Sequence, residues 1–135
     1  MSTASKTIYR IAIAIVERNG KILIAQRRPD SHLGGLWEFP GGKVHEGESP
    51  EQAVVRECRE EVGIGVRVDR FFARVEHEYE DRRIELVSYI CTLEEGKPSP
   101  LHCAACEWVS PAELSHFHFP EANRPILKRL TDEAL

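Results

Sequence analysis

The chain has 135 residues, with 18 basic against 22 acidic side chains and a formal net charge of −4. This length suits a single domain over residues 1–135 with its own hydrophobic core, and the acidic balance disfavours DNA or RNA, whose phosphates are neutralised by basic residues. No export signal and no apolar run long enough to span a bilayer is present, so we expect a cytoplasmic protein without a membrane partner.

The first elements read as a β-hairpin followed by a loop. Residues 8–16 are rich in β-branched side chains, Asn19-Gly20 is a hairpin turn signal, and residues 21–26 read as the partner strand. Residues 27–40 show no clear periodicity and predict a loop. A short strand at 37–39 then runs into Pro40-Gly41-Gly42, whose glycines allow the backbone to approach a ligand closely.

The stretch from Ser49 to Gly63 carries the start and stop signals of a helix. Ser49 suits the N-cap, Pro50 the first helical position, Gln52 completes a capping box, and Gly63 suits the left-handed C-terminal position. The stretch therefore predicts a helix that ends at Gly63.

Two arcs are expected on this helix at 100° per residue. The apolar arc should face the core and comprises Val54, Val55, Cys58 and Val62. The adjacent arc comprises the three acids Glu57, Glu60 and Glu61. Like charges at this spacing repel, and hard oxygen ligands suit Mg²⁺ or Mn²⁺, although a solvated acidic face is the common alternative for such a pattern.

The second half of the chain predicts another hairpin, over 66–79 and 83–93 with a turn around Asp81. A loop at 94–100, a strand at 107–109, a brief helix beginning at Ser110-Pro111, and a helix over 124–130 follow. Mixed strands with two substantial helices predict an α+β fold or an α/β/α sandwich. The four cysteines are expected to be reduced. Cys103 and Cys106, with His102 nearby, could form a zinc or redox site, but a second CxxC pair is absent and buried thiols are favoured.

The segment 42–64 resembles the Nudix box, G-x5-E-x7-R-E-U-x-E-E-x-G-U, in which U is apolar. Its fixed places are filled by Gly42, Glu48, Arg56, Glu57, Cys58, Glu60, Glu61, Gly63 and Ile64. The one soft departure is the cysteine at an apolar position, which concerns packing and not chemistry. The resemblance implies a Nudix hydrolase that cleaves a nucleoside diphosphate linked to another group, on an α/β/α sandwich with a mixed β-sheet.

The same resemblance implies the chemical roles in the box. The metal ligands would be the carbonyl of Gly41 and the carboxylates of Glu57, Glu60 and Glu61, holding Mg²⁺, with Mn²⁺ as the alternative. Glu57 or Glu60 would also orient or deprotonate the attacking water, and the choice stays open. Arg56 would clamp a neighbouring carboxylate, and Glu48 would brace the junction between loop and helix.

The resemblance reaches beyond the box, because residues 25–44 and 119–130 look like the MutT-type branch of 8-oxo-dGTP diphosphatases. By this resemblance the substrate-binding residues are Arg27, Phe39, Tyr79, Arg82 and Asn123. An asparagine amide offers one donor and one acceptor, which match O6 and the protonated N7 of an oxidised guanine. The alternative is that Asn123 only caps the C-terminal helix.

The resemblance implies hydrolysis of 8-oxo-dGTP, or a related oxidised purine nucleotide, to the monophosphate and pyrophosphate, which sanitises the nucleotide pool. Residues 20–27, 35–44 and 108–114 resemble the CTP or 5-methyl-dCTP pyrophosphohydrolases as well, and that substrate class is the nearest rival. A non-catalytic nucleotide sensor is the rival from another class, and the intact glutamates count against it. A monomer and a homodimer both remain open.

Overall fold

The computed structural model describes residues 7–133, and the prediction of one domain over 1–135 extends beyond this range. The elements, in chain order, are β1 (Thr7–Arg18), β2 (Lys21–Gln26), β3 (Trp37–Glu38), β4 (Gly41–Lys43), α1 (Pro50–Val62), β5 (Gly65–Glu78), β6 (Arg82–Glu95), β7 (Ala105–Val109), the 3₁₀ helices η1 (Pro111–His116) and η2 (Glu121–Asn123), and α2 (Arg124–Asp132). Both predicted hairpins and both predicted helices are confirmed. Within the described range, no helix is long and apolar enough to cross a membrane.

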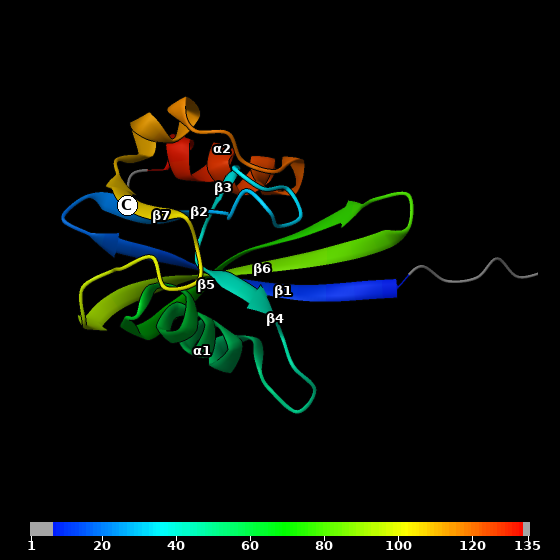
Figure 1. Cartoon of the computed structure of the whole chain (residues 1–135), viewed down its shortest axis with the longest axis horizontal. Coiled ribbons are helices and arrows are strands. Elements are labelled where there is room, and N and C mark those ends of the chain that lie inside the picture. Colours follow the sequence, from blue (N-terminus) through cyan, green and yellow to red (C-terminus); the bar gives the residue numbers. More distant parts are fainter. Residues whose placement is uncertain (1–6, 134–135) are drawn as a thin grey trace, which may run out of the picture.

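The strands form one mixed seven-stranded sheet with the order β3-β2-β1-β6-β5. β1 runs parallel to β6, and the other pairings, including those of β4 with β1 and β7 with β2, are antiparallel. Helix α1 covers one face of the sheet and α2 covers the other (Figure 1). The predicted α+β fold with a mixed sheet between helices is therefore confirmed.

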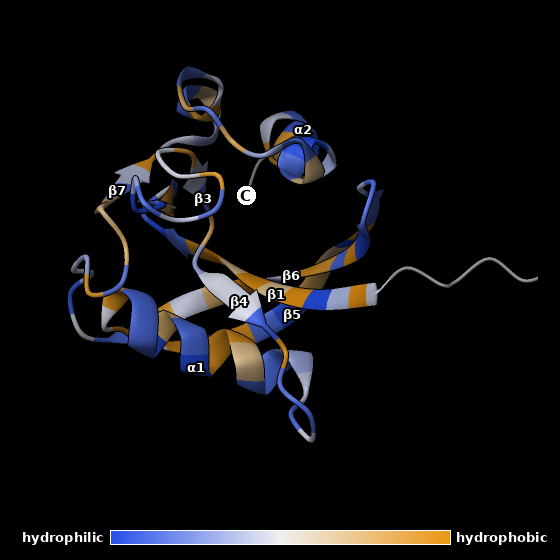
Figure 2. Ribbon diagram, turned by 45° about the vertical axis from the view of Figure 1, so that its right-hand side comes forward, coloured by the Kyte–Doolittle hydropathy of each residue, from blue (hydrophilic) through white to orange (hydrophobic). Residues whose placement is uncertain are grey.

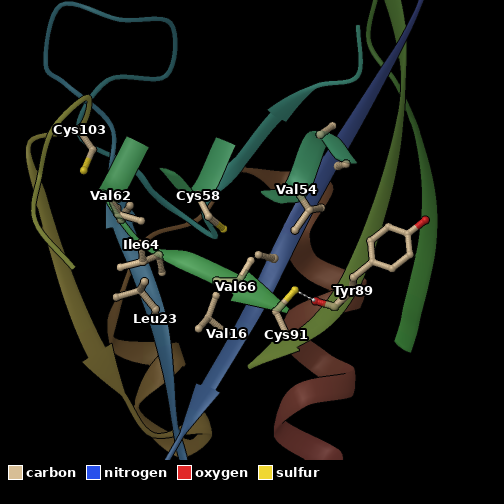
Figure 3. Close-up of a cluster of buried hydrophobic side chains, with 14 of the residues drawn as sticks. Val16, Leu23, Val54, Cys58, Val62, Ile64, Val66, Tyr89, Cys91 and Cys103 are labelled. Carbon is tan, nitrogen blue, oxygen red and sulfur yellow. Dashed lines mark hydrogen bonds between the residues drawn. The ribbon is translucent and has the colours of Figure 1, made fainter. Parts of the chain in front are cut away.

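Alternation along β1 produces a separate core on each face of the sheet, because successive strand residues point to opposite faces. Ala12 and Ala14 belong to the core beneath α1, whereas Ile13 and Ile15 belong to the core beneath α2. The α1 core gathers side chains from the helix and from several strands (Figure 3). The hydrophilic side of α1 faces away from the sheet (Figure 2). The site residues of α1 and those near α2 therefore approach the sheet from opposite sides.

The strands of the first hairpin separate soon after their turn. Asn19 and Gly20 both have positive φ, as a two-residue hairpin turn requires, and only two residue pairs join β1 to β2. β3 then pairs with the end of β2, and β4 pairs with Ile11–Ile13 of β1. The segment 37–43 thus fills the gap between the two strands. Strand β4 was not predicted, because glycine is disfavoured in strands.

The predicted capping of α1 is confirmed. The hydroxyl of Ser49 accepts from the N–H of Gln52, whose side chain accepts from the N–H of Ser49, and Gly63 adopts φ 73°. The predicted burial of Val55 is wrong. This side chain is 37% exposed, because it lies at the rim of the apolar arc, in a shallow depression beside Val68, instead of beneath the helix.

Candidate active site

The two glycines of β4 are packed closely against neighbouring elements. A Cβ on Gly41 would meet the carbonyl oxygen of Ala12 and lie 2.7 Å from the Cα of Ile13. A Cβ on Gly42 would lie 2.6 Å from the carboxyl carbon of Glu57. The two glycines therefore bring the backbone of β4 against β1 on one side and against the acidic arc of α1 on the other.

The guanidinium of Arg56 ties the loop before α1 to the acidic arc. It donates two hydrogen bonds to the carboxylate of Glu48, at 2.8 and 3.1 Å, and one to the carbonyl of Lys43. Its Nη1 donates to Glu57 at 2.9 Å and to Glu60 at 3.1 Å. The Arg56 guanidinium and the N–H of His45 lower the pKa of Glu48 to about 2. The structure thus brings Arg56 and Glu48 into contact at the junction between the loop and the helix.

The three predicted acidic ligands differ in burial. Glu60 is exposed, Glu57 is half-buried, and Glu61 is only 7% exposed. The N–H of Gly41 donates to the Glu61 carboxylate, whose buried Oε1 has no hydrogen-bond partner among residues 7–133. Burial, followed by the charges of Glu38 and Glu57, raises the pKa of Glu61 to about 9. Burial also raises the pKa of Glu57.

This arrangement fits a divalent cation. The unpaired oxygen of Glu61 lacks the partner that a buried carboxylate requires, and the donors nearby are the hard oxygens that Mg²⁺ prefers. In the described part of the chain, no three acidic, histidine or cysteine side chains are gathered as a ready metal cluster. Instead, Glu57 and Glu60 both point their carboxylates at the guanidinium of Arg56.

A cavity of about 390 Å³ lies on the other side of β4. All five residues predicted to bind substrate line it, namely Arg27, Phe39, Tyr79, Arg82 and Asn123. Gly41 and Gly42 line it too, so the single strand β4 lies between the cavity and the acidic arc. Apolar side chains from β1 and β6 complete the wall: Ile11, Ile13, Ile84 and Leu86.

Asn123 is the buried amide in this wall. It is 7% exposed and immediately precedes α2, but its side chain does not cap the helix. Its φ of −83° and ψ of −10° are helical, whereas an N-cap residue that bonds the helix usually has extended backbone. Within the range 7–133, no hydrogen bond joins the side-chain amide of Asn123 to another residue. The side-chain oxygen and nitrogen are therefore both free for a ligand. The capping alternative is therefore not supported.

The other lining residues are held by specific contacts. Arg27 donates to Glu38 at 2.8 Å and to the carbonyl of His32 at 2.6 Å. The buried ring of Phe39 lies 5.3 Å from that of Phe119. The N–H of Tyr79 donates to the carbonyl of Arg82 at 2.8 Å. This bond closes the β5–β6 turn and brings both residues to the cavity.

Sequence reasoning missed Glu38, which connects the two halves of the site. Its carboxylate bonds Arg27 in the cavity wall and also contacts the carboxyl group of Glu61. Burial outweighs the attraction of Arg27 and raises the pKa of Glu38. The available signal was an acid between Trp37 and Phe39 in a strand with little other polarity. Asp81 and His32 also line the cavity.

The cysteines lie apart from the cavity lining, and all four are free thiols. Cys103 is buried beside the carbonyl of Glu61, at 3.9 Å, and burial raises the pKa of its thiol to about 11. Cys106 is half-buried, and burial raises its pKa as well. Neither thiol has the lowered pKa that marks a reactive cysteine.

Comparison with known proteins identifies clear relatives. The NUDIX domain family matches residues 11–129. The chain is 41% identical over 122 residues to the 8-oxo-dGTP diphosphatase of Escherichia coli K12, covering 90% of this chain and 95% of that one. It is also 41% identical over 121 residues to the CTP pyrophosphohydrolase of the same organism, covering 90% of both.

Solved structures agree with this pattern. The solution structure of the Escherichia coli ORF135 protein superimposes with a TM-score of 0.78 at 38% identity, covering 91% of this chain and 88% of that one. A MutT structure from a study of the Aliivibrio salmonicida and Vibrio cholerae proteins gives a TM-score of 0.78 at 33% identity, covering 93% and 97%. Both the sequence and the fold of the chain therefore place it among these proteins.

Proposed function

The chain belongs to the NUDIX family and is a Nudix hydrolase, and from this premise we propose that it hydrolyses 8-oxo-dGTP, or a related oxidised purine nucleotide, to the monophosphate and pyrophosphate. Such a reaction removes oxidised precursors from the nucleotide pool. The observation that carries the proposal is the buried, unbonded amide of Asn123 in a cavity that shares the Gly41–Gly42 strand with the acidic arc.

Asn123 supplies the selectivity in this proposal. Oxidation at C8 places a proton on N7, so the guanine edge presents an acceptor at O6 beside a donor at N7. The Nδ2 of Asn123 donates to O6, and its Oδ1 accepts from N7–H. Plain guanine has an acceptor at N7, which leaves the Oδ1 unpaired. Sites of this kind discriminate by roughly 10⁴-fold or more.

Arg27, Tyr79 and Arg82 surround the nucleotide in this proposal, and the backbone of Phe39 contacts the base or sugar. The apolar side chains from β1 and β6 pack against the faces of the base and exclude water. Because Glu38 fixes the guanidinium of Arg27, the cavity wall is ordered before substrate arrives.

The polyphosphate lies on the glycine strand, next to the acidic arc. The Gly41 carbonyl, Glu57, Glu60 and Glu61 would hold a divalent cation, in our proposal Mg²⁺ with Mn²⁺ as the alternative, and the cation would supply neutralisation of phosphate charge. Arg56, fixed by Glu48, keeps the carboxylates of Glu57 and Glu60 on one side of the helix. Glu57 or Glu60 orients the attacking water and accepts its proton.

In the reaction, the water oxygen bonds to the β-phosphorus while the bond from that phosphorus to the α,β-bridging oxygen breaks. The bridging oxygen leaves with the nucleoside monophosphate. The β- and γ-phosphoryl groups leave as pyrophosphate.

The test is steady-state kinetics with Mg²⁺ on 8-oxo-dGTP, dGTP, CTP and 5-methyl-dCTP, with the products resolved. We expect kcat/KM for 8-oxo-dGTP to exceed that for dGTP by about 100-fold or more, a difference of roughly 2.7 kcal/mol in transition-state binding. Asn123→Ala should remove this preference. Equal turnover of the two purine nucleotides would refute the proposed base recognition.

A pyrimidine substrate is the second candidate, because the CTP pyrophosphohydrolase of Escherichia coli is as similar to the chain as the 8-oxo-dGTP diphosphatase. In that case CTP or 5-methyl-dCTP should have the highest kcat/KM, and Asn123→Ala should have little effect on it. The same substrate panel separates the two candidates.

A further inference from the structure

Helix α2 follows the base-reading residue directly, so the placement of the helix decides the placement of Asn123. A nine-residue helix is marginal by itself and depends on tertiary contacts. Two of its side chains, Ile126 and Leu130, are fully buried against the sheet. Leu127 of the same helix packs against this core as well, and these apolar contacts supply no hydrogen bond between α2 and the sheet.

Arg129 supplies the directional contact. Its Nη1 donates to the carbonyl of Phe72 in β5, and its guanidinium stacks over the Phe72 ring at 4.1 Å from the centroid. Its Nε donates to Glu133, which orients the guanidinium from the other side. A stacked guanidinium that also donates a hydrogen bond fixes both distance and angle between two elements.

The carbonyl of Phe72 is available because β5 is irregular at this point. β5 is the last strand in the sheet order, and its register with β6 shifts between Phe71 and Ala73. The hydroxyl of Ser88 in β6 bonds both the N–H and the carbonyl of Ala73 across this irregularity. Phe72 itself is buried and has no register partner in β6. Arg129 therefore attaches α2 to β5 at one of the three register shifts of this strand.

We propose that Arg129 is a positioning residue for base selectivity: by fixing α2 on β5 at Phe72, it holds the Asn123 amide where it pairs with both edge atoms of the base. Arg129 lies six residues after Asn123, roughly 9 Å along the helix axis. A bidentate contact tolerates only small displacements, so a small rotation of α2 would break one of its two bonds. The inference rests on the proposed base recognition by Asn123.

The test compares Arg129→Gln, Arg129→Lys and Lys128→Gln. Glutamine removes the charge and the stacking, and lysine keeps the charge. Lys128 is the matched control, because it is a 77% exposed cation on the same helix and, among residues 7–133, pairs only with Asp132. For Arg129→Gln we expect the ratio of kcat/KM for 8-oxo-dGTP over dGTP to fall about tenfold. KM for 8-oxo-dGTP should rise while kcat stays within about twofold.

Arg129→Lys should recover only part of the ratio, because lysine keeps a charged donor but not the planar group that stacks on Phe72. Lys128→Gln should keep all of it. In an Asn123→Ala background, Arg129→Gln should have no further effect on the ratio, because it acts through that amide. An unchanged ratio in Arg129→Gln overturns the inference. An equal fall of the ratio in the wild-type and Asn123→Ala backgrounds also overturns it. So does a lowered Tm accompanied by the same fall in kcat for both nucleotides.

Failure of the proposed function is recognised separately, as a wild-type protein without preference for 8-oxo-dGTP. The inference is then decided by the side-chain amide signals of Asn123 in NMR spectra of the nucleotide-free protein. A shift or broadening in Arg129→Gln, absent in Lys128→Gln, supports it. Unchanged signals in Arg129→Gln overturn it.

Discussion

Glu57 is the residue at which the glycine strand and the acidic arc meet, since its carboxylate packs on Gly42 and bonds Arg56. Glutamine keeps its shape but removes the charge and the capacity to accept a proton. We expect Glu57→Gln to fold normally and to lose about 10²-fold or more of kcat, measured with saturating substrate and Mg²⁺.

The matched control is Glu46→Gln, an exposed acid in the loop before α1. This variant should keep normal turnover. It tests whether the loss of any one negative charge near the site is enough to lower kcat. Turnover of Glu57→Gln near the wild-type rate, with Glu46→Gln also normal, would remove Glu57 from the proposed mechanism.

Glu48 makes a pH-dependent contribution to stability. Its pKa is lowered from 4.5 to about 2 by Arg56 and by the N–H of His45, so its ionised form is favoured in the folded state. The resulting stabilisation is complete above pH 4.5 and is lost as the pH falls towards 2. We therefore expect Tm, measured from pH 6 to pH 2.5 without metal, to fall less steeply in Glu48→Gln than in the wild type. Parallel curves of Tm against pH would show that the Glu48–Arg56 pair does not contribute to the pH dependence of stability.

At the scale of elements, β4 makes different demands on its two glycines. A Cβ on Gly41 would meet the backbone of β1, which cannot move aside within a paired sheet, whereas a Cβ on Gly42 would meet the mobile carboxylate of Glu57. We expect Gly41→Ala to cost about 1–3 kcal/mol of stability, and Gly42→Ala to keep Tm but lose about tenfold in kcat/KM. Thermal unfolding and kinetics on the two variants check this. Equal loss of Tm in both would contradict the distinction.

The elements that the sequence predicts correctly are those whose signals are local. The boundaries of α1 follow from Ser49, Pro50 and Gly63, and the first turn follows from Asn19-Gly20, because capping and turn chemistry depend on neighbouring residues. Strand β4 could not be predicted, since the partner that makes glycine necessary is β1, about thirty residues earlier in the chain. The exposure of Val55 was also missed. Periodicity gives the direction in which this side chain points from the helix, but it does not show how far the sheet extends beneath the helix.

For the whole molecule, the site joins segments that are far apart in sequence. The cavity draws on β1, the loop before β3, the β5–β6 turn and η2, and the acidic arc approaches from the opposite face of the sheet. A motif with fixed spacing identifies the acidic arc from sequence. The cavity residues carry no such spacing, so the family resemblance was needed to nominate Asn123, and Glu38 stayed hidden although it contacts both halves.

Because the cavity walls come from both ends of the chain, a bound nucleotide should stabilise the molecule as a unit. With Mg²⁺ present and the product 8-oxo-dGMP at about 100 times its Kd, we expect roughly 2.7 kcal/mol of added stability, or a rise in Tm of roughly 8–10 °C. At the same concentration dGMP should give a much smaller rise, since in the proposed base recognition Asn123 pairs fully only with the oxidised edge. Asn123→Ala should make the two shifts equal by lowering the larger one. Equal shifts in the wild type would mean that the cavity does not read the oxidised edge, and a larger shift with CMP would favour the pyrimidine candidate.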